Sequence, residues 1–261
     1  MIDLTIDGGL AVVTLHNPET RNSLAAPDLE ELAEVLSRAE RAARPGPNRV
    51  RALVVRGSGG AFCSGRNIAG VDPETDDVPR FLDGLVAPVM RQISEFPAPS
   101  YAAVTGPCLG VGLGLAIACD VVYVEESAKI GSPFARLGAT LDSGGHALFV
   151  ERLGTHRALD LIYSGRLLSG TEAVAAGLFS RVFPDGLVED ETLEAARTAS
   201  TGATDAFLAS KEIVQRIRDE RLGLWATMEL ETRAQTALRE TSDYREGFAA
   251  FQEKRRPVFR R

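Results

Sequence analysis

The sequence is poor in cysteine and histidine. It has three of each in 261 residues: Cys63, Cys108, Cys119, His16, His146 and His156. An odd, scattered set of cysteines does not predict a disulfide framework, and no cysteine or histidine has a neighbour at metal-ligand spacing. We therefore expect buried thiols that pack as small hydrophobic side chains, and no metal site.

The chain also lacks an excess of positive charge and any long apolar run. Its formal net charge is −7, which argues against a nucleic-acid partner because no domain-wide basic surface can displace phosphate counterions. Residues 1–4 lack the basic start and apolar core of a secretory signal, and no charge-free segment reaches membrane-spanning length. These features predict a cytoplasmic protein that binds neither nucleic acid nor a membrane.

The basic residues are densest at the C-terminus. There the chain carries Lys254, Arg255, Arg256, Arg260 and Arg261. A solvated tail and a local site for an anionic small molecule are both compatible with this composition.

The remaining composition, 44% hydrophobic and 25% charged, is that of a folded globular protein. Strand and helix patterns alternate as far as residue 183, which predicts an α/β core over residues 1–187. Beyond Pro184 the strand patterns stop, and residues 189–256 have the spacing of amphipathic helices. We therefore expect a second, helical region over residues 188–261.

The central stretch, residues 102–120, combines a short apolar run with four glycines. Residues 102–104 predict a buried strand, and the glycines that follow allow a tight turn; they are Gly106, Gly110, Gly112 and Gly114. The spacing permits a helix from Val111 onward, whose first N–H groups would have no intrahelical partner. Such groups can polarise a substrate oxygen, but close packing of the helix on a sheet would explain the glycines equally well.

Two phosphate-binding motifs do not fit this stretch. A Walker loop needs a lysine after its glycines, and none follows here. A dinucleotide fingerprint that begins at Gly110 would need a glycine at position 115, where the chain has Leu115.

A second glycine-rich turn, residues 57–67, follows another predicted strand, residues 50–55. The sequence therefore presents strand, glycine turn and helix twice. Residues 72–79 are acidic and contain proline, which predicts a mobile loop before a helix over residues 80–95.

Six segments together resemble the crotonase (enoyl-CoA hydratase/isomerase) family in order and spacing. They are residues 16–24 (HNPETRNSL), 59–68 (GGAFCSGRNI), 102–120, 128–145, 172–183 (EAVAAGLFSRVF) and 251–259 (FQEKRRPVF). The resemblance implies a spiral of ββα repeats followed by a helical C-terminal trimerisation region. It also implies a homotrimer or hexamer that acts on acyl-CoA thioesters, with coenzyme A as part of the substrate and no separate cofactor.

The resemblance assigns functional positions as well. The two backbone N–H groups that polarise the thioester oxygen would be those of Arg66 and Val111. The positions that would contact the substrate or its CoA group are Arg21, Leu24, Ser64, Ile68, Phe134, Phe251, Lys254 and Arg255. Of these, Arg21, Lys254 and Arg255 would bind the CoA phosphates, and Phe251 would lie beside the adenine.

The chain departs from the family at two positions. Hydratases of the family use two glutamates, and this sequence has Gly114 and Phe134 at the matching places. Hydration needs a base for water and a proton for carbon, so the loss of both carboxylates argues against efficient hydration.

One acid remains near these motifs, Asp142, followed by Ser143, Gly144 and Gly145. The local pattern alone is typical of a turn or helix N-cap. By resemblance, the same position carries a catalytic aspartate in isomerases of the family. We also expect Val111, Phe134 and Leu141 to exclude water from this carboxyl and raise its proton affinity.

Four functions remain open. An enoyl-CoA isomerase needs one base, and Asp142 is sufficient for it, which favours this function. A hydratase or lyase needs a second acid, and Glu125 and Glu126 are expected to be exposed. The third function is that of a non-catalytic acyl-CoA-binding protein, and the fourth is that of a hydrolase or dehalogenase that uses Asp142 covalently.

Overall fold

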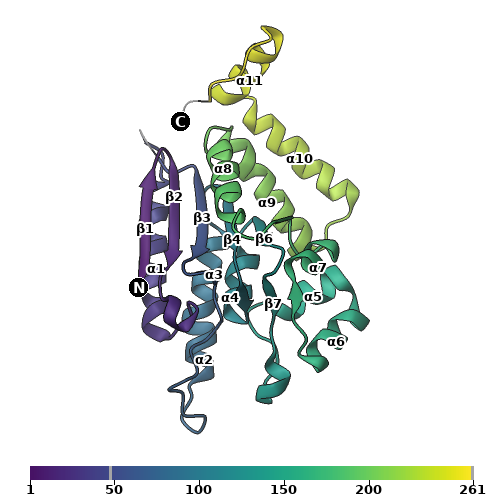
Figure 1. The fold of residues 1–261 in the computed structure, drawn as a ribbon. Helices are drawn as coiled ribbons and strands as arrows, with labels where there is room; N and C mark the ends of the chain where they lie inside the picture. Colours follow the sequence, from purple (N-terminus) through teal and green to yellow (C-terminus); the bar gives the residue numbers. More distant parts are fainter. Residues whose placement is uncertain (47–48, 260–261) are drawn as a thin grey trace.

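The computed structural model describes residues 1–46 and 49–259. A six-stranded sheet with the order β1-β2-β3-β4-β6-β9 forms its centre, and a three-stranded sheet with the order β5-β7-β8 lies beside it (Figure 1). The strands are β1 (Ile2–Asp7), β2 (Leu10–Leu15), β3 (Ala52–Gly57), β4 (Ser100–Val104), β5 (Pro107–Leu109), β6 (Val121–Glu125), β7 (Lys129–Gly131), β8 (Leu168–Ser169) and β9 (Arg181–Phe183).

Helices connect these strands and follow them. They are η1 (Pro18–Thr20), α1 (Ala26–Ala42), α2 (Val78–Phe81), η2 (Leu82–Val86), α3 (Ala87–Ser94), α4 (Val111–Ala118), η3 (Phe134–Leu137), α5 (Gly145–Leu153), α6 (Thr155–Ser164), α7 (Gly170–Ala175), α8 (Val188–Ser200), α9 (Thr204–Glu220), α10 (Leu224–Leu238) and α11 (Ser242–Gln252).

The main sheet begins as a hairpin and continues in parallel. β1 and β2 pair antiparallel across a two-glycine turn, and β2, β3, β4, β6 and β9 then pair in parallel. Parallel neighbours need a crossover, and the predicted helices supply it after β2, β3 and β4. The repeated order of strand, glycine turn and helix is therefore confirmed.

Both faces of the sheet are covered by helices. Leu29, Leu32 and Leu36 of α1 are buried in the main hydrophobic core, as their spacing on one helix face predicts. On the other face Ala196 of α8 packs with Ala52 of β3 in a smaller cluster. The mixed α/β fold with C-terminal helices is therefore confirmed.

The change of architecture near residue 187 is visible in the order of elements. Among the described residues β9 is the last strand, and α8 begins at Val188. α8 covers the sheet, however, so the first helix after the predicted boundary packs with the core. The division into two regions stays a prediction, and Arg260 and Arg261 lie outside the described residues.

All three cysteines are free and buried, as predicted. Burial raises the pKa of the Cys63 thiol to about 12, so this thiol is not poised to act as a nucleophile. Within residues 1–46 and 49–259, no three or more histidine, cysteine, aspartate or glutamate side chains form a group able to hold a metal ion. No helix in the same part of the chain has the length and hydropathy to span a membrane.

The C-terminal helices leave much apolar surface exposed. α10 has no buried residue, and Trp225 on it is 76% exposed. The large apolar side chains exposed on α9, α10 and α11 are Phe207, Val214, Leu224, Trp225, Met228, Phe248 and Phe251. Apolar patches of this kind mark association surfaces.

We therefore predict that the protein assembles through these helices as a homotrimer or a hexamer. Light scattering coupled to gel filtration at micromolar protein is expected to give three or six times the 27.9 kDa chain mass. A monomeric mass under these conditions would contradict the prediction.

Candidate active site

The two glycine-rich turns lie side by side. Cys63 and Cys108 form a parallel bridge, in which the Cys63 N–H donates to Pro107 O at 2.9 Å and the Leu109 N–H donates to Cys63 O at 3.0 Å. A Cβ atom on Gly65 would lie 2.8 Å from Leu109 O and 3.8 Å from Val111 N. Gly65 therefore allows the backbone before Arg66 to approach the start of α4.

The N–H groups of Arg66 and Val111 are free to bind a ligand. Leu24 pairs with Arg66 in a second parallel bridge, which uses Gly65 O and the Asn67 N–H and leaves the Arg66 N–H off the ladder. Val111 is the first residue of α4, so its N–H has no partner within the helix. In the described part of the chain neither N–H donates a hydrogen bond to protein. Two free donors on adjacent turns can accept a developing oxyanion.

Gly110 shapes the turn before α4. Its φ of 51° lies in the left-handed region, which favours glycine, and its own N–H donates to Gly131 O at 3.1 Å. A Cβ at this position would lie 3.0 Å from Cζ of Phe134. The apolar Phe134 ring therefore packs against the turn that presents the Val111 N–H.

Asn22 ties the N-terminal loop to the first glycine turn. Its side-chain amide donates to Ser58 O at 2.9 Å and to Ala61 O at 2.7 Å, and its Oδ1 accepts from the Asn17 N–H. Asn22 is buried. Nothing in the sequence singles out this residue, because an asparagine in a polar turn gives no signal of its distant partners.

Asp142 lies in the loop before α5 and does not cap that helix. Gly144 is the N-cap residue of α5 and makes no side-chain cap bond, whereas Asp142 O accepts the Gly145 N–H at 2.9 Å. Oδ1 of Asp142 and Oγ of Ser143 are buried and have no hydrogen-bond partner among the described residues. Ser143 also has a φ of 48°, unusual for a residue other than glycine and often found at functional sites. Two adjacent buried polar atoms without partners indicate a place for a ligand or water.

Burial raises the pKa of the Asp142 carboxyl above its ordinary value, as expected. The neighbouring Ser143 side chain and the positive charge of Arg66 oppose part of this rise. Val111 and Leu141 are buried in the core, and Phe134 is half-buried. A carboxyl with a raised pKa is a stronger base than an exposed aspartate.

The space beside Gly114 is filled. A Cβ there would lie 2.6 Å from Cβ of Ser143 and 3.1 Å from Sδ of Met90. A larger side chain at position 114 would therefore collide with the loop that carries Asp142. Neither Met90 nor Ser143 was predicted as a site residue, since only the tertiary contact with Gly114 shows their place.

The Arg66 side chain is held on both sides. Its Nη1 and Nη2 donate to the two carboxylate oxygens of Asp76 at 2.8 and 2.5 Å, and its guanidinium lies 4.0 Å from the centre of the Phe81 ring. This hydrogen-bonded pair lowers the pKa of the Asp76 carboxyl. The acidic segment predicted as a mobile loop is therefore fastened to the site, because Asp76 pairs with a cation from the first glycine turn.

Four other predicted positions lie around the two turns. Leu24 is 2% exposed and Ile68 is 52% exposed. The Ser64 N–H donates to Arg21 O, and the Ser64 hydroxyl donates to Thr20 O, both at 3.0 Å. Ser64 thus fixes the loop, while the exposed Arg21 side chain remains a predicted CoA contact.

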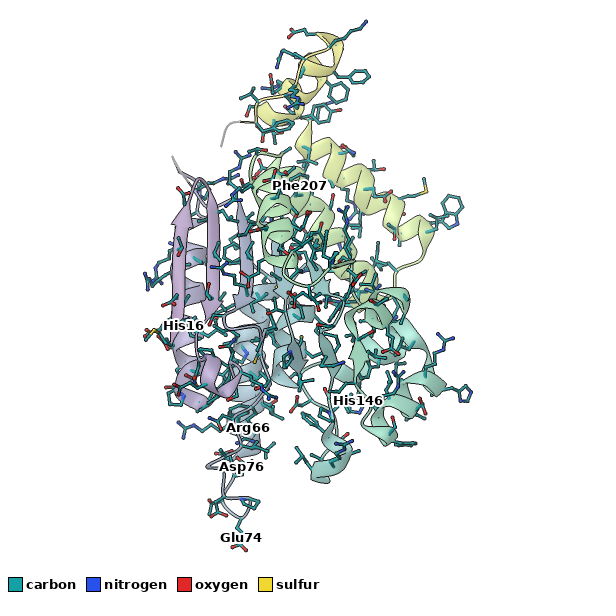
Figure 2. The ribbon with its side chains drawn as sticks, viewed as in Figure 1. His16, Arg66, Glu74, Asp76, His146 and Phe207 are labelled. Carbon is teal, nitrogen blue, oxygen red and sulfur yellow. The ribbon has the colours of Figure 1, made fainter. Side chains whose placement is uncertain are left out.

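The C-terminal candidates lie elsewhere. α11, which carries Phe251, is at the opposite end of the molecule from Arg66 (Figures 1 and 2). Phe251 is 85% exposed, and Lys254 is also exposed. Arg255 is paired with Glu246 and Glu253 at 2.6 Å each. A single chain therefore does not bring these residues to the two glycine turns.

The two turns thus present two free backbone N–H groups, and the partly buried Asp142 lies in the loop that packs against Gly114 of α4. The family model for enoyl-CoA hydratase/isomerase matches residues 5–261. The chain belongs to the enoyl-CoA hydratase/isomerase family and is an acyl-CoA enzyme of that family.

Individual proteins show the same similarity. A protein of Rhodobacter capsulatus named "Probable enoyl-CoA hydratase" is 35% identical over 254 residues, which cover 97% of this chain and 95% of that protein. The 1,2-epoxyphenylacetyl-CoA isomerase of Escherichia coli is 31% identical over 258 residues, which cover 97% and 96%. The crystal structure of an enoyl-CoA hydratase from Bacillus anthracis superposes with a TM-score of 0.87 at 29% identity, covering 99% of this chain and 98% of that one.

CoA binding is expected to depend on Arg21 and Lys254, which would act from two different subunits because α11 is distant from the glycine turns. Each alanine variant should raise the Kd for CoA about 10- to 150-fold at low salt, since a hydrogen bond to a charged group contributes about 1.5–3 kcal/mol. Calorimetry can measure this, with Arg38→Ala, an exposed arginine of α1, as the control. Unchanged affinity in both variants would show that the assignment is wrong.

The partly buried Asp142 carboxyl should also lower the stability of the folded protein near neutral pH. A carboxyl whose folded pKa is raised binds more protons in the native state, so stability falls as pH rises from the unfolded pKa, about 3.9, through the folded one. Asp142→Asn removes this penalty and should raise the free energy of unfolding near neutral pH. The gain should vanish below about pH 4.

Urea denaturation across this pH range, at one fixed protein concentration, measures the effect. Asp83→Asn in η2 is the control, because Asp83 is exposed. The expectation fails if Asp142→Asn destabilises the protein at neutral pH, or if it raises the free energy of unfolding equally at all pH values.

Proposed function

We propose that the protein is an enoyl-CoA isomerase that moves a double bond between the β,γ and α,β positions of an acyl-CoA. The observation that supports this most directly is that the loop carrying the Asp142 carboxyl packs tightly against Gly114, where no side chain fits. One partly buried carboxyl, whose Oδ1 has no partner, is available as a base, and a side chain at position 114 would meet Ser143 and Met90. An isomerase needs one base, and no cofactor beyond the CoA that the substrate carries.

The chemistry follows from the positions of the donors and the base. The thioester oxygen accepts hydrogen bonds from the N–H groups of Arg66 and Val111, each typically worth about 3–4 kcal/mol when the enolate forms. Asp142 removes a proton from the α or γ carbon, the C–H electron pair enters the conjugated enolate, and the protonated Asp142 returns the proton to the other carbon. Atoms and charge balance without water.

Other carboxylates are poorly placed to serve as a second acid. Asp76 is held by Arg66 and has a lowered pKa, so it stays ionised. Glu126 is exposed, as predicted, whereas Glu125, also expected to be exposed, is half-buried and accepts the Gly186 N–H at 2.9 Å. Phe134 offers an apolar ring where hydratases of the family have an acid.

Hydration is the second candidate, supported by the name of the Rhodobacter capsulatus relative rather than by a second acid in this site. The similarity to an epoxyphenylacetyl-CoA isomerase supports isomerisation in the same way. The two reactions differ in whether water adds to the double bond, so one substrate series separates them.

Asp142→Asn keeps the shape of the side chain and removes the base. We expect exchange of the α proton with deuterated water to fall about 10²- to 10⁴-fold, the usual contribution of a general base. Mass spectrometry of saturated and β,γ-unsaturated acyl-CoAs, from butyryl-CoA to decanoyl-CoA, measures this exchange and the double-bond shift together. Asp83→Asn again serves as the control.

Two results would contradict the proposal. One is an Asp142→Asn variant that exchanges the α proton as fast as the parent. The other is a parent protein that hydrates crotonyl-CoA efficiently.

A further inference from the structure

The Arg66 side chain is unusually constrained for an arginine next to a glycine turn. Its fork meets both oxygens of Asp76, its flat face lies on the Phe81 ring, and the side chains of Arg66 and Asp76 are only 23% and 17% exposed. Figure 2 shows Arg66 and Asp76 next to each other, with Glu74 farther out on the same loop. A planar, two-bond contact of this kind fixes orientation as well as charge.

The loop that carries Asp76 is itself well ordered by local bonds. Oδ1 of Asp72 accepts the Glu74 N–H at 3.0 Å, and its Oδ2 accepts the Thr75 hydroxyl at 3.1 Å. Oδ1 of Asp77 accepts the Arg80 N–H at 3.0 Å and caps α2. These turns deliver the Asp76 carboxylate to a defined position.

Few charged groups of the described chain bear on Asp142. Arg66 is the one whose charge acts on this carboxyl. His146 of α5 contacts Thr140 at 3.4 Å, and Arg136 of η3 is exposed. The direction in which the Arg66 guanidinium points therefore bears on the electrostatic environment of the base.

We propose that Asp76 is a positioning residue: its ion pair with Arg66 fixes the peptide that presents the Arg66 N–H and keeps the guanidinium from pairing with Asp142. This inference rests on the proposed role of Asp142 as the base. A guanidinium released from Asp76 would be free to form an ion pair with Asp142, and a carboxylate paired with arginine is a weaker base. The loop over residues 72–77 thus keeps the Arg66 N–H in place and prevents the Arg66 guanidinium from neutralising Asp142.

The test compares the pH dependence of kcat for α-proton exchange in four variants. Asp76→Asn removes the carboxylate charge and should lower kcat about 10- to 100-fold, the scale expected for a misplaced catalytic group, with KM changed much less. Its acid limb should move to lower pH, because the released cation favours ionised Asp142. Asp76→Glu keeps the carboxylate and should restore most of the lost kcat.

Arg66→Gln gives the opposite electrostatic change. Without the cation near Asp142, the acid limb of the profile should move to higher pH. Glu74→Gln, an exposed change in the same loop, should leave kcat, KM and the profile as in the parent. A purely structural role of this loop would not move the acid limb in opposite directions in Asp76→Asn and Arg66→Gln.

The proposal is overturned if Asp76→Asn behaves as Glu74→Gln does, or if both charge variants move the acid limb in the same direction. Should Asp76→Asn not fold, the Arg66→Gln and Asp76→Glu profiles still decide the question, and an unmoved limb in Arg66→Gln refutes the idea. Asp142→Asn, assayed alongside, distinguishes failure of the isomerase proposal from failure of the proposed role of Asp76. Full exchange activity in Asp142→Asn removes the isomerase proposal itself, whereas an inactive Asp142→Asn with unaffected Asp76→Asn removes only the role of Asp76.

Discussion

The site depends on the parallel bridge between Cys63 and Cys108, which lays one glycine turn along the other. Backbone hydrogen bonds of 2.9 and 3.0 Å fix the two segments, so the N–H groups of Arg66 and Val111 are held without partners on adjacent turns. Donors fixed before the substrate arrives need no reorganisation when charge develops on the oxygen. Asn22, Gly65 and Gly110 are all placed so that this approach of two backbones can occur.

Side chains around this backbone frame differ in function although they lie close together. Asp142 is partly buried and its Oδ1 has no partner, so desolvation raises its pKa, whereas the ion pair with Arg66 lowers the pKa of Asp76. The pKa values of these two aspartates are thus shifted in opposite directions, upward by desolvation at Asp142 and downward by the ion pair at Asp76. Because Gly114 has no side chain, the loop of Asp142 can lie close to α4.

The C-terminal helices α9, α10 and α11 leave large apolar side chains exposed to solvent. Trp225 and Phe251 are 76% and 85% exposed, and α11 lies far from the two glycine turns (Figure 1). The single chain therefore completes its core and places the Arg66 and Val111 N–H groups on adjacent turns, but it leaves an apolar surface and a group of basic residues apart from them. Association of subunits would supply partners to both.

The sequence by itself determined the alternation of strands, glycine turns and helices, and the apolar face of α1, because side-chain periodicity and glycine spacing are local properties. Its ordered motifs also identified the family, and they predicted the two backbone donors, since both inferences depend on short segments. Only the tertiary structure decided that Asp76 holds Arg66, that Ser143 and Met90 fill the space at Gly114, and that α11 is remote from the site. Those facts depend on contacts between residues distant in the chain, and a charged loop or a glycine in a helix has the same local pattern whether or not such a partner exists.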